Sequence, residues 1–127
     1  MPCRYVIDIE RRLVVSTGWD RVTFAEMKAH QDKLASDPDF NPEFDQFVDA
    51  TTVSVLEASP DQLRTIISRR FFSPTSRRAF VASNLHVLAL GRVMEIHAKL
   101  TAGREQIRLF HDRVSALQWL ALENSLA

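Results

Sequence analysis

The segment at residues 45–59, DQFVDATTVSVLEAS, constrains the fold of this chain most. A short apolar run, Phe47-Val48, ends in Asp49 and gives way to residues rich in Thr, Val and Ser. Ser59 then opens the capping box Ser-Pro-Asp-Gln, with proline at the first helical position, where its missing N–H costs nothing. The segment therefore predicts a strand at about 46–49, a loop and a helix. In an open α/β sheet, sites are usually built where a central strand ends, so we expect the site in this loop.

Two strands and a helix are predicted before this segment. Residues 4–9, RYVIDI, alternate in polarity, which indicates a strand. Residues 13–19, LVVSTGW, indicate the strand that returns from it, so the domain should open with an antiparallel hairpin. Thr23 and Glu26 form another capping box, and the apolar residues that follow at helical spacing predict a helix to about Ser36.

Two strands and three helices are predicted from Ser59 onward. The helix that begins there is expected to end near Phe72, with an apolar face of Leu63, Ile66, Ile67 and Phe71. A strand is expected at 78–82. Ser83-Asn84 can cap the next helix, which should end at Gly103 and bury Leu85, Leu88, Ala89, Val93, Ile96 and Leu100. A strand at 106–110 precedes a final helix, capped by Asp112, that carries Val114, Leu117, Leu120 and Ala121.

The order of these elements defines the fold class. The pattern is β-β-α-β-α-β-α-β-α, and strands separated by helices call for parallel pairing through right-handed crossovers. A chain of 127 residues is long enough for the core of one domain. We therefore expect a single α/β domain over residues 1–127. Its mixed open sheet should contain about five strands, an N-terminal hairpin followed by parallel β-α units, with about four helices.

Composition excludes several classes of partner. Lys and Arg together number 16, as do Asp and Glu, so the net charge is zero and neither nucleic acid nor an anionic membrane is indicated as a partner. The single cysteine, Cys3, excludes an intrachain disulfide and fits a reducing compartment. No apolar run reaches membrane-spanning length, and the first residues lack the apolar core of a signal peptide. We expect a cytoplasmic protein without membrane insertion.

The charges are balanced in number but not in position. Residues 34–61 contain seven acids and no Lys or Arg, whereas residues 62–94 contain six arginines and no acid. The simpler interpretation is that these segments neutralise each other, within one chain or across a symmetric dimer. The alternative is a basic rim that holds an anionic ligand.

No pattern of catalytic or metal-binding residues is evident. The four histidines lack the short spacing of a metal site: His30, His86, His97 and His111. The chain has no G-x-S-x-G motif and no Gly-rich phosphate loop, and Cys3 is expected to be a structural thiol. We expect no enzyme activity, metal or cofactor. The weakest interpretation is a hydrolase, which requires a histidine within hydrogen-bond reach of Thr51, Ser54 or Ser59.

Five segments occur in a familiar order along nearly the whole chain: YVIDIERRLVVSTGWDRVT, DPDFNPEFDQFVDAT, RRAFVAS, LGRVME and IRLFHDRVSALQWL. Together they resemble the SpoIIAA-like family, small bacterial domains related to STAS domains. The resemblance implies an open mixed sheet flanked by helices, in agreement with the pattern of strands and helices.

The resemblance also implies two kinds of function. STAS domains are interaction modules, and some are switched by phosphorylation of a serine just before the helix that follows the central strand. Ser59 occupies that place, although Glu57-Ala58-Ser59-Pro60 replaces the expected Asp-Ser-Ser-Gly, and we favour a helix N-cap over a phosphorylation switch. Members of the wider group are compared with lipid-carrying CRAL-TRIO domains, which implies an apolar pocket.

Two main interpretations follow. The first is a non-enzymatic STAS-like protein-interaction or regulatory module, a homodimer with an unidentified protein partner. Its regulatory or ligand loop would carry Asp49, Thr51, Thr52, Ser54 and Ser59, and its face for an anion or partner would carry Arg69, Arg70, Arg77, Arg78 and Arg92. The second is a carrier of a small apolar or lipid-like ligand, which needs a cavity lined by residues such as Phe71, Leu88 and Met94.

Overall fold

A five-stranded sheet organises the computed structural model, which describes residues 2–69, 71–102 and 106–126. The strands are β1 (Cys3–Asp8), β2 (Leu13–Thr23), β3 (Asp45–Glu57), β4 (Arg78–Ala82) and β5 (Ile107–Phe110). The helices are α1 (Phe24–Ala35), α2 (Pro60–Ser68), α3 (Leu85–Ala102) and α4 (Arg113–Leu126). The strand order is β1-β2-β3-β4-β5, with β1 antiparallel to β2 and the other neighbours parallel. The predicted α/β class with a mixed open sheet is confirmed.

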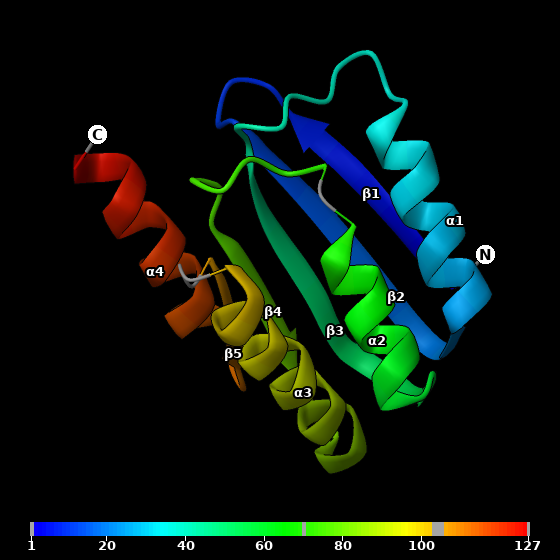
Figure 1. Cartoon of the computed structure of the whole chain (residues 1–127). Coiled ribbons are helices and arrows are strands. Elements are labelled where there is room, and N and C mark those ends of the chain that lie inside the picture. The colour runs from blue at the N-terminus through cyan, green and yellow to red at the C-terminus, as the bar shows by residue number, and fades with distance from the viewer. Residues whose placement is uncertain (1, 70, 103–105, 127) are drawn as a thin grey trace.

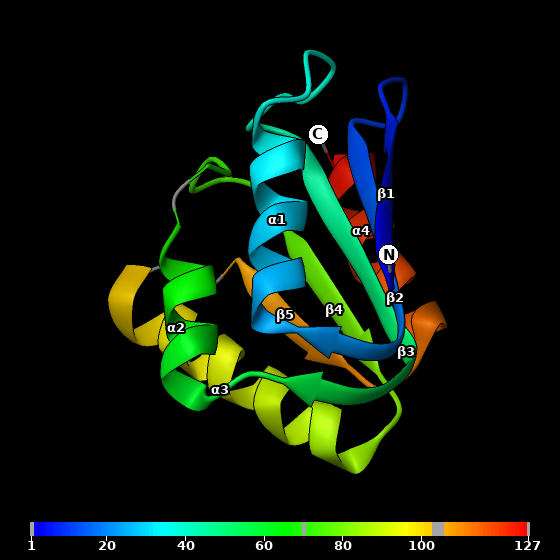
Figure 2. The same cartoon turned by 90° about the vertical axis from the view of Figure 1, so that its right-hand side faces the viewer.

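The helices are divided unequally between the two faces of the sheet. Helices α1, α2 and α3 cover one face, and α4 covers part of the other (Figures 1 and 2). Strands β2 to β5 lie in the sheet in the same order as in the sequence. Right-handed crossovers therefore place all three connecting helices on the same side. Helix α4 follows the last strand and makes no crossover, which leaves it free to pack on the opposite face.

Strand β3 is longer than predicted. It extends through Glu57, so residues 50–57, expected as a loop, belong to the strand. The reason is β2, which continues to Thr23 and offers a pairing partner along this length. The β-branched side chains of this segment also suit a pleated strand. The pairing shifts register beside Asp20, whose φ of 55° lies in the left-handed region that aspartate tolerates better than most residues.

Helix α2 is shorter than predicted. It ends at Ser68 instead of near Phe72, because the backbone at Arg69 becomes extended. Phe71 is therefore not part of its apolar face. Phe71 and Phe72 pack instead against Phe40, with ring centroids 5.8 and 5.2 Å away. This aromatic group covers one end of the sheet beside the buried cluster of Val14, Leu34 and Phe44.

The buried face of α3 also differs from the prediction. The residues it buries are Val87, Gly91, Met94, Glu95 and Ala98. Leu85 and Leu100, expected in the core, are 84% and 80% exposed, and Ala89 and Ile96 are exposed as well. Gly91 explains why α3 turns this face to the sheet. A Cβ at this position would lie 2.8 Å from Cδ1 of Leu109, which is too close, so only glycine fits without a shift of that side chain. The glycine lets the helix approach β5 closely on a side that hydrophobicity alone does not indicate.

The predicted helix caps are confirmed. Thr23 and Ser59 each form a complete capping box at the start of α1 and α2. Asn84 Oδ1 accepts backbone N–H groups at the start of α3, and Asp112 Oδ1 accepts one at the start of α4. Gly103, the predicted end of α3, lies outside the described residues.

Helix α4 packs on the sheet through fewer residues than predicted. Ala116 and Leu120 are buried against β3 and β4, with Trp119 packed beside them. Val114 and Leu117, also expected on this face, are exposed.

None of the described helices is both long and apolar enough to cross a membrane.

Glu95 joins α3 to the edge of the sheet. Its side chain is buried, and Oε2 accepts the backbone N–H of Leu109 at 2.8 Å. Its Oε1 forms an ion pair with Arg92. Because β5 is an edge strand, this carboxylate satisfies a backbone donor on the side where the sheet ends.

We expect Glu95→Ala to lower the free energy of unfolding by roughly 1–3 kcal/mol, because it leaves the Leu109 N–H without its acceptor. Glu95→Gln keeps an acceptor oxygen at the same place and should be less destabilising. Urea denaturation of both variants measures the difference. Equal losses for the two variants would contradict the assigned role.

Candidate functional site

A pocket of about 120 Å³ lies between the sheet and helices α1, α2 and α3. Side chains alternate along a strand, so inward-facing residues of β2, β3 and β4 form its floor. The three helices form its walls. Most of the lining is apolar and comprises Val22, Met27, Val48, Ala50, Val53, Leu56, Ile66, Ile67, Phe80, Val87, Met94 and Ile107.

Polar residues line the pocket as well, and four of them form a hydrogen-bonded chain that we call the polar row: Ser16, His30, Gln46 and Arg78. Ser16 Oγ lies 3.0 Å from His30 Nε2, and Gln46 Nε2 donates to Ser16 Oγ at 3.0 Å. Arg78 Nε donates to Gln46 Oε1 at 3.4 Å. The row thus runs from α1 across β2 and β3 to β4. Ser16 and Gln46 are only 4% and 7% exposed, so the centre of the row is shielded from water.

The direction of each hydrogen bond follows from Arg78. A guanidinium only donates, so Gln46 presents its carbonyl oxygen to Arg78 and its amide nitrogen to Ser16. Ser16 Oγ therefore accepts from Gln46, and its own proton is directed to His30 Nε2. His30 then carries its proton on Nδ1. Burial, followed by the charge of Lys33, lowers the pKa of His30, in keeping with a neutral ring that accepts a hydrogen bond.

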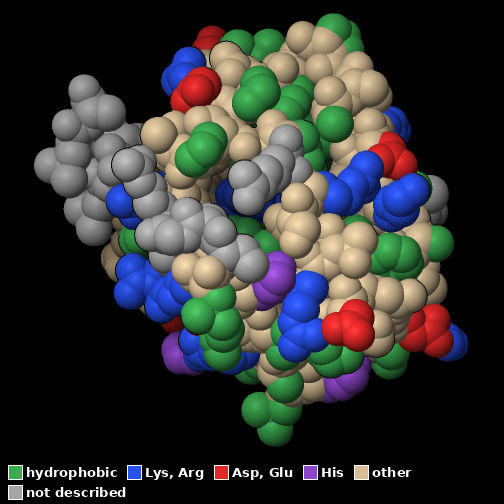
Figure 3. Space-filling view, viewed as in Figure 1, with side chains coloured by type: hydrophobic (Ala, Val, Ile, Leu, Met, Phe, Trp, Pro, Cys, Tyr) green, Lys and Arg blue, Asp and Glu red, His purple; other side chains and the backbone are tan. Residues whose placement is uncertain are grey.

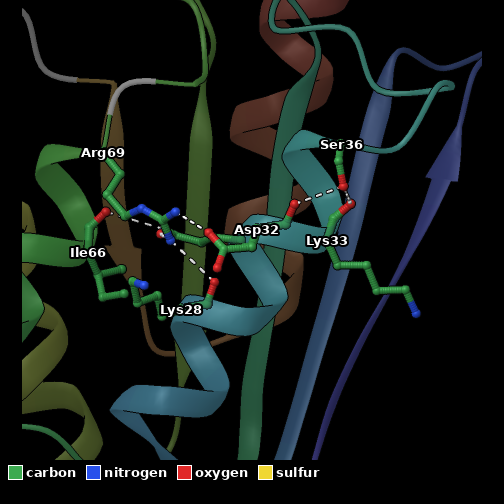
Figure 4. A network of polar contacts seen from close by, with 7 residues as sticks. Lys28, Asp32, Lys33, Ser36, Ile66 and Arg69 are labelled. Carbon is green, nitrogen blue, oxygen red and sulfur yellow. Dashed lines mark hydrogen bonds and ion pairs between the residues drawn. The ribbon is translucent and has the colours of Figure 1, made fainter.

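Arg69 joins the two helices beside the pocket, α1 and α2 (Figure 4). Its Nη1 donates to the Lys28 carbonyl at 3.2 Å and to Gln31 Oε1 at 3.1 Å, and its Nη2 pairs with Asp32. Gln31 Nε2 in turn donates to the Ile66 carbonyl at 3.3 Å. These bonds hold α2 against α1 and so fix the width of the pocket on that side.

A second hollow, of about 220 Å³, lies between α3, β5 and the start of α4. Its charged groups already have partners within the chain. Arg92 pairs with Glu95, and Asp112 accepts the backbone N–H that caps α4 at 2.8 Å. His111, at its rim, is largely exposed. The first pocket is the better candidate site, because its polar centre is buried among apolar walls.

Asp49 and Thr51, predicted as site residues, lie on the opposite side of the sheet from the pocket. Asp49 Oδ1 accepts the backbone N–H of Thr51 at 3.0 Å and its hydroxyl at 2.6 Å. Asp49 Oδ2 accepts from Arg113 Nη1 of α4 at 2.8 Å. The aspartate therefore attaches α4 to the central strand.

The remaining predicted hydroxyl residues also have structural partners. Thr52 and Ser54 donate to the carbonyl groups of Gly18 and Asp20 in β2, each at 3.2 Å. Ser59 is exposed, and its Oγ accepts a backbone N–H as the N-cap of α2. None of these side chains lines the pocket.

The predicted arginine face is not one surface. Arg69 joins α1 to α2, Arg92 pairs within α3, and Arg77 lies over a tryptophan ring of α4, 4.9 Å from its centroid. Of the four arginines of this predicted face that the structure describes, Arg78 alone lines the pocket. Arg70 lies outside the described residues. Figure 3 shows several basic side chains next to acidic ones on the right-hand side of the view.

The hydroxyl–histidine pairs differ from those that the hydrolase interpretation requires. Thr51, Ser54 and Ser59 have the partners given above. His30 contacts Ser16 instead, and His97 Nε2 lies 3.1 Å from the hydroxyl of Ser68 on the surface. Within the part of the chain that the structure describes, no group of three or more His, Cys, Asp or Glu side chains could hold a metal ion.

Three residues of the polar row were not identified from the sequence, although each carries a signal. Ser16 follows Val14 by two positions, so it shares the buried side of β2. Gln46 precedes Val48 by two positions in the same way. His30 falls among Met27, Gln31 and Leu34 on the apolar stripe of α1. Buried faces are normally apolar, so a polar side chain at such a position indicates a hydrogen-bonded group in the core in each case.

The polar row predicts a dependence of stability on pH. Because the pKa of His30 is lower in the folded protein, the unfolded chain takes up a proton first as the pH falls below about 6.5. The free energy of unfolding should therefore decrease between pH 7 and pH 5, and it should decrease less in His30→Gln. Urea denaturation at both pH values measures this. An NMR titration in which His30 has a midpoint at or above 6.5 would contradict the prediction.

A comparison with solved structures identifies the fold. The chain is similar to the crystal structure of an uncharacterized protein from the DUF3478 family with a SpoIIAA-like fold, from Shewanella loihica PV-4. The TM-score is 0.58 at 20% sequence identity, and the match covers 93% of each chain. No family model and no curated protein matches the sequence. At this identity the likeness shows the fold alone, and it confirms that this chain has the SpoIIAA-like fold.

Proposed function

We propose that this protein is a non-catalytic binding module whose pocket holds a small, largely apolar molecule. The observation that carries the proposal is the apolar pocket between sheet and helices, with its buried polar centre. Its volume, about 120 Å³, is close to that of an engineered cavity of about 150 Å³ that holds benzene. A ligand body of about six carbons therefore suits it better than a complete lipid.

The lining agrees in part with what a carrier requires. Met94 lines the pocket as expected, whereas Phe71 and Leu88 do not. Phe71 belongs to the aromatic group with Phe40, and Leu88 lines the second hollow. The ligand is therefore held nearer the middle of the sheet, over Val48 and Ala50, where apolar contact and exclusion of water favour binding.

Binding suits the polar row better than catalysis does. Ser16 and His30 form a hydroxyl–imidazole pair, but a nucleophile also needs a third group that orients the histidine. Among the described residues, His30 Nδ1 has no such hydrogen-bonding partner. Ser16 is, moreover, shielded from solvent, and its oxygen already accepts from Gln46. These features support a site that holds a molecule without transforming it.

Hexan-1-ol tests the pocket without depending on a charged group. At ten times its dissociation constant, it should stabilise the protein by about 1.4 kcal/mol. Val48→Phe fills the pocket and should abolish this stabilisation. Val55→Phe, on the same strand but outside the pocket, is the matched control and should retain it. Thermal denaturation with and without hexan-1-ol measures the effect, and equal stabilisation of the two variants would overturn the proposed site.

We also propose that the protein forms a homodimer through the free edge of β1. Strand β1 ends the sheet on one side, and Figure 2 shows it on the outside, beside α1. Val6 and Ile9, on or directly after this strand, are 62% and 56% exposed. An unpaired edge with exposed apolar side chains can be extended by another strand.

The sequence of β1 is complementary to itself. Antiparallel pairing about a twofold axis at Val6 places Val6 beside its own counterpart. The same register sets Arg4 beside Asp8 of the second copy, twice by symmetry. It also brings Ile9 beside Cys3 of the second copy. Opposite charges and apolar side chains facing each other across strands favour this register.

Charge reversal tests the dimer. Asp8→Arg should weaken dimerisation, because it faces Arg4 of the second copy with a like charge. The double variant Arg4→Asp with Asp8→Arg restores both opposite-charge pairs and should recover the dimer. Sedimentation equilibrium over a range of concentrations measures the dissociation constants. A wild-type protein that stays monomeric, or a double variant no better than the single one, would contradict the proposal.

A further inference from the structure

The hydrogen bonds of the polar row leave it with donors to offer a ligand. Gln46 Oε1 accepts from Arg78, and one N–H of its amide goes to Ser16 Oγ. No described residue accepts the second N–H of this buried amide. A buried donor without an acceptor is costly, so an acceptor atom in the pocket would stabilise it. The Ser16 hydroxyl donates to His30, so the donor that remains beside the ligand space is this second N–H of Gln46.

Among the described residues that line the pocket, the charge has one sign. Arg78 is the only Lys or Arg among the described lining residues, and none of them is Asp or Glu. Its guanidinium is held over the Phe72 ring, 4.8 Å from the centroid, while its Nε contacts Gln46. Arginine stays protonated at any physiological pH, so it places a fixed positive charge at the pocket.

The lining of the pocket along β3 changes from polar to apolar. Gln46 and Arg78 lie at the amino ends of the parallel strands β3 and β4. The lining continues along β3 to Val53 and Leu56, which are apolar and buried. A lining arranged in this way suits a chain with one polar end.

We infer that the ligand is a short-chain monocarboxylate, whose carboxylate meets Gln46 and Arg78 and whose alkyl chain lies along β3 toward Leu56. This inference rests on the proposed binding function. A carboxylate is acceptor-only when ionised, which matches a row that offers donors. Its charge strengthens each hydrogen bond relative to a neutral head group such as a hydroxyl.

The test compares hexanoate with hexan-1-ol, which have the same number of carbons and differ in the head group. Isothermal titration calorimetry with the intact protein at pH 7.5 gives both affinities. Hexanoate should bind at least about tenfold more tightly, as expected for one additional charge-assisted hydrogen bond. Equal affinities, or tighter binding of hexan-1-ol, would overturn the carboxylate and leave the proposed binding function standing. If neither compound binds, both proposals fail.

Two neighbouring arginines provide a matched pair of variants. Arg78→Gln should remove the preference for hexanoate over hexan-1-ol. Arg77→Gln, whose side chain lies on the α4 side of the sheet, should keep the preference. Should Arg78→Gln not fold, Arg78→Lys retains the charge and Gln46→Leu removes the amide donor. A preference for hexanoate that survives Arg78→Gln or Gln46→Leu would overturn the inference.

Discussion

The pairing of β2 with β3 is the interaction on which the rest of this structure depends. The two strands are parallel, so the chain must cross from the end of one to the start of the other, and α1 makes that crossing. The helix consequently lies over the strands it connects. This arrangement places His30 of α1 above Ser16 of β2, with Gln46 of β3 beside them. The centre of the polar row is thus built by a single crossover unit.

The same pairing determines where the core is incomplete. On the α4 side, Ala79, Val81 and Leu120 pack closely with Phe47. On the other side, three helices meet over the middle of the sheet, and their side chains leave a cavity bordered by polar groups. A cavity forgoes dispersion contacts, and a buried amide N–H that has no acceptor among the described residues adds to the cost. The cavity and the buried amide, both destabilising, occur at the same place in this protein. This is the pattern expected where a core also serves as a binding site.

Local signals in the sequence predict this fold well and its site poorly. Each capping box, at Thr23 and at Ser59, depends on two residues three positions apart. The first residues of these helices can therefore be predicted from the local sequence alone. The length of β3 depends on its neighbour β2, and the buried face of α3 depends on how closely Gly91 approaches β5. The polar row combines residues from four elements, and only the tertiary structure brings them together. The expected site at the carboxyl end of β3 rests on a general rule for open sheets, whereas the polar row lies near the amino ends of β3 and β4.

The pocket and the edge of β1 are connected through two aromatic rings. Tyr5 of β1 packs edge-on against His30, with ring centroids 5.4 Å apart, and its hydroxyl donates to Asp37 at 2.7 Å, beyond the end of α1. A ligand beside His30 therefore lies one residue away from the strand whose outer edge is proposed to form the dimer. If the ligand favours one position of this ring pair, it changes the dimerisation constant. Linkage then requires dimerisation to change ligand affinity by the same factor. If the dimerisation constant is the same with and without ligand, α1 and β1 hold these two rings in one position in the free and the bound protein.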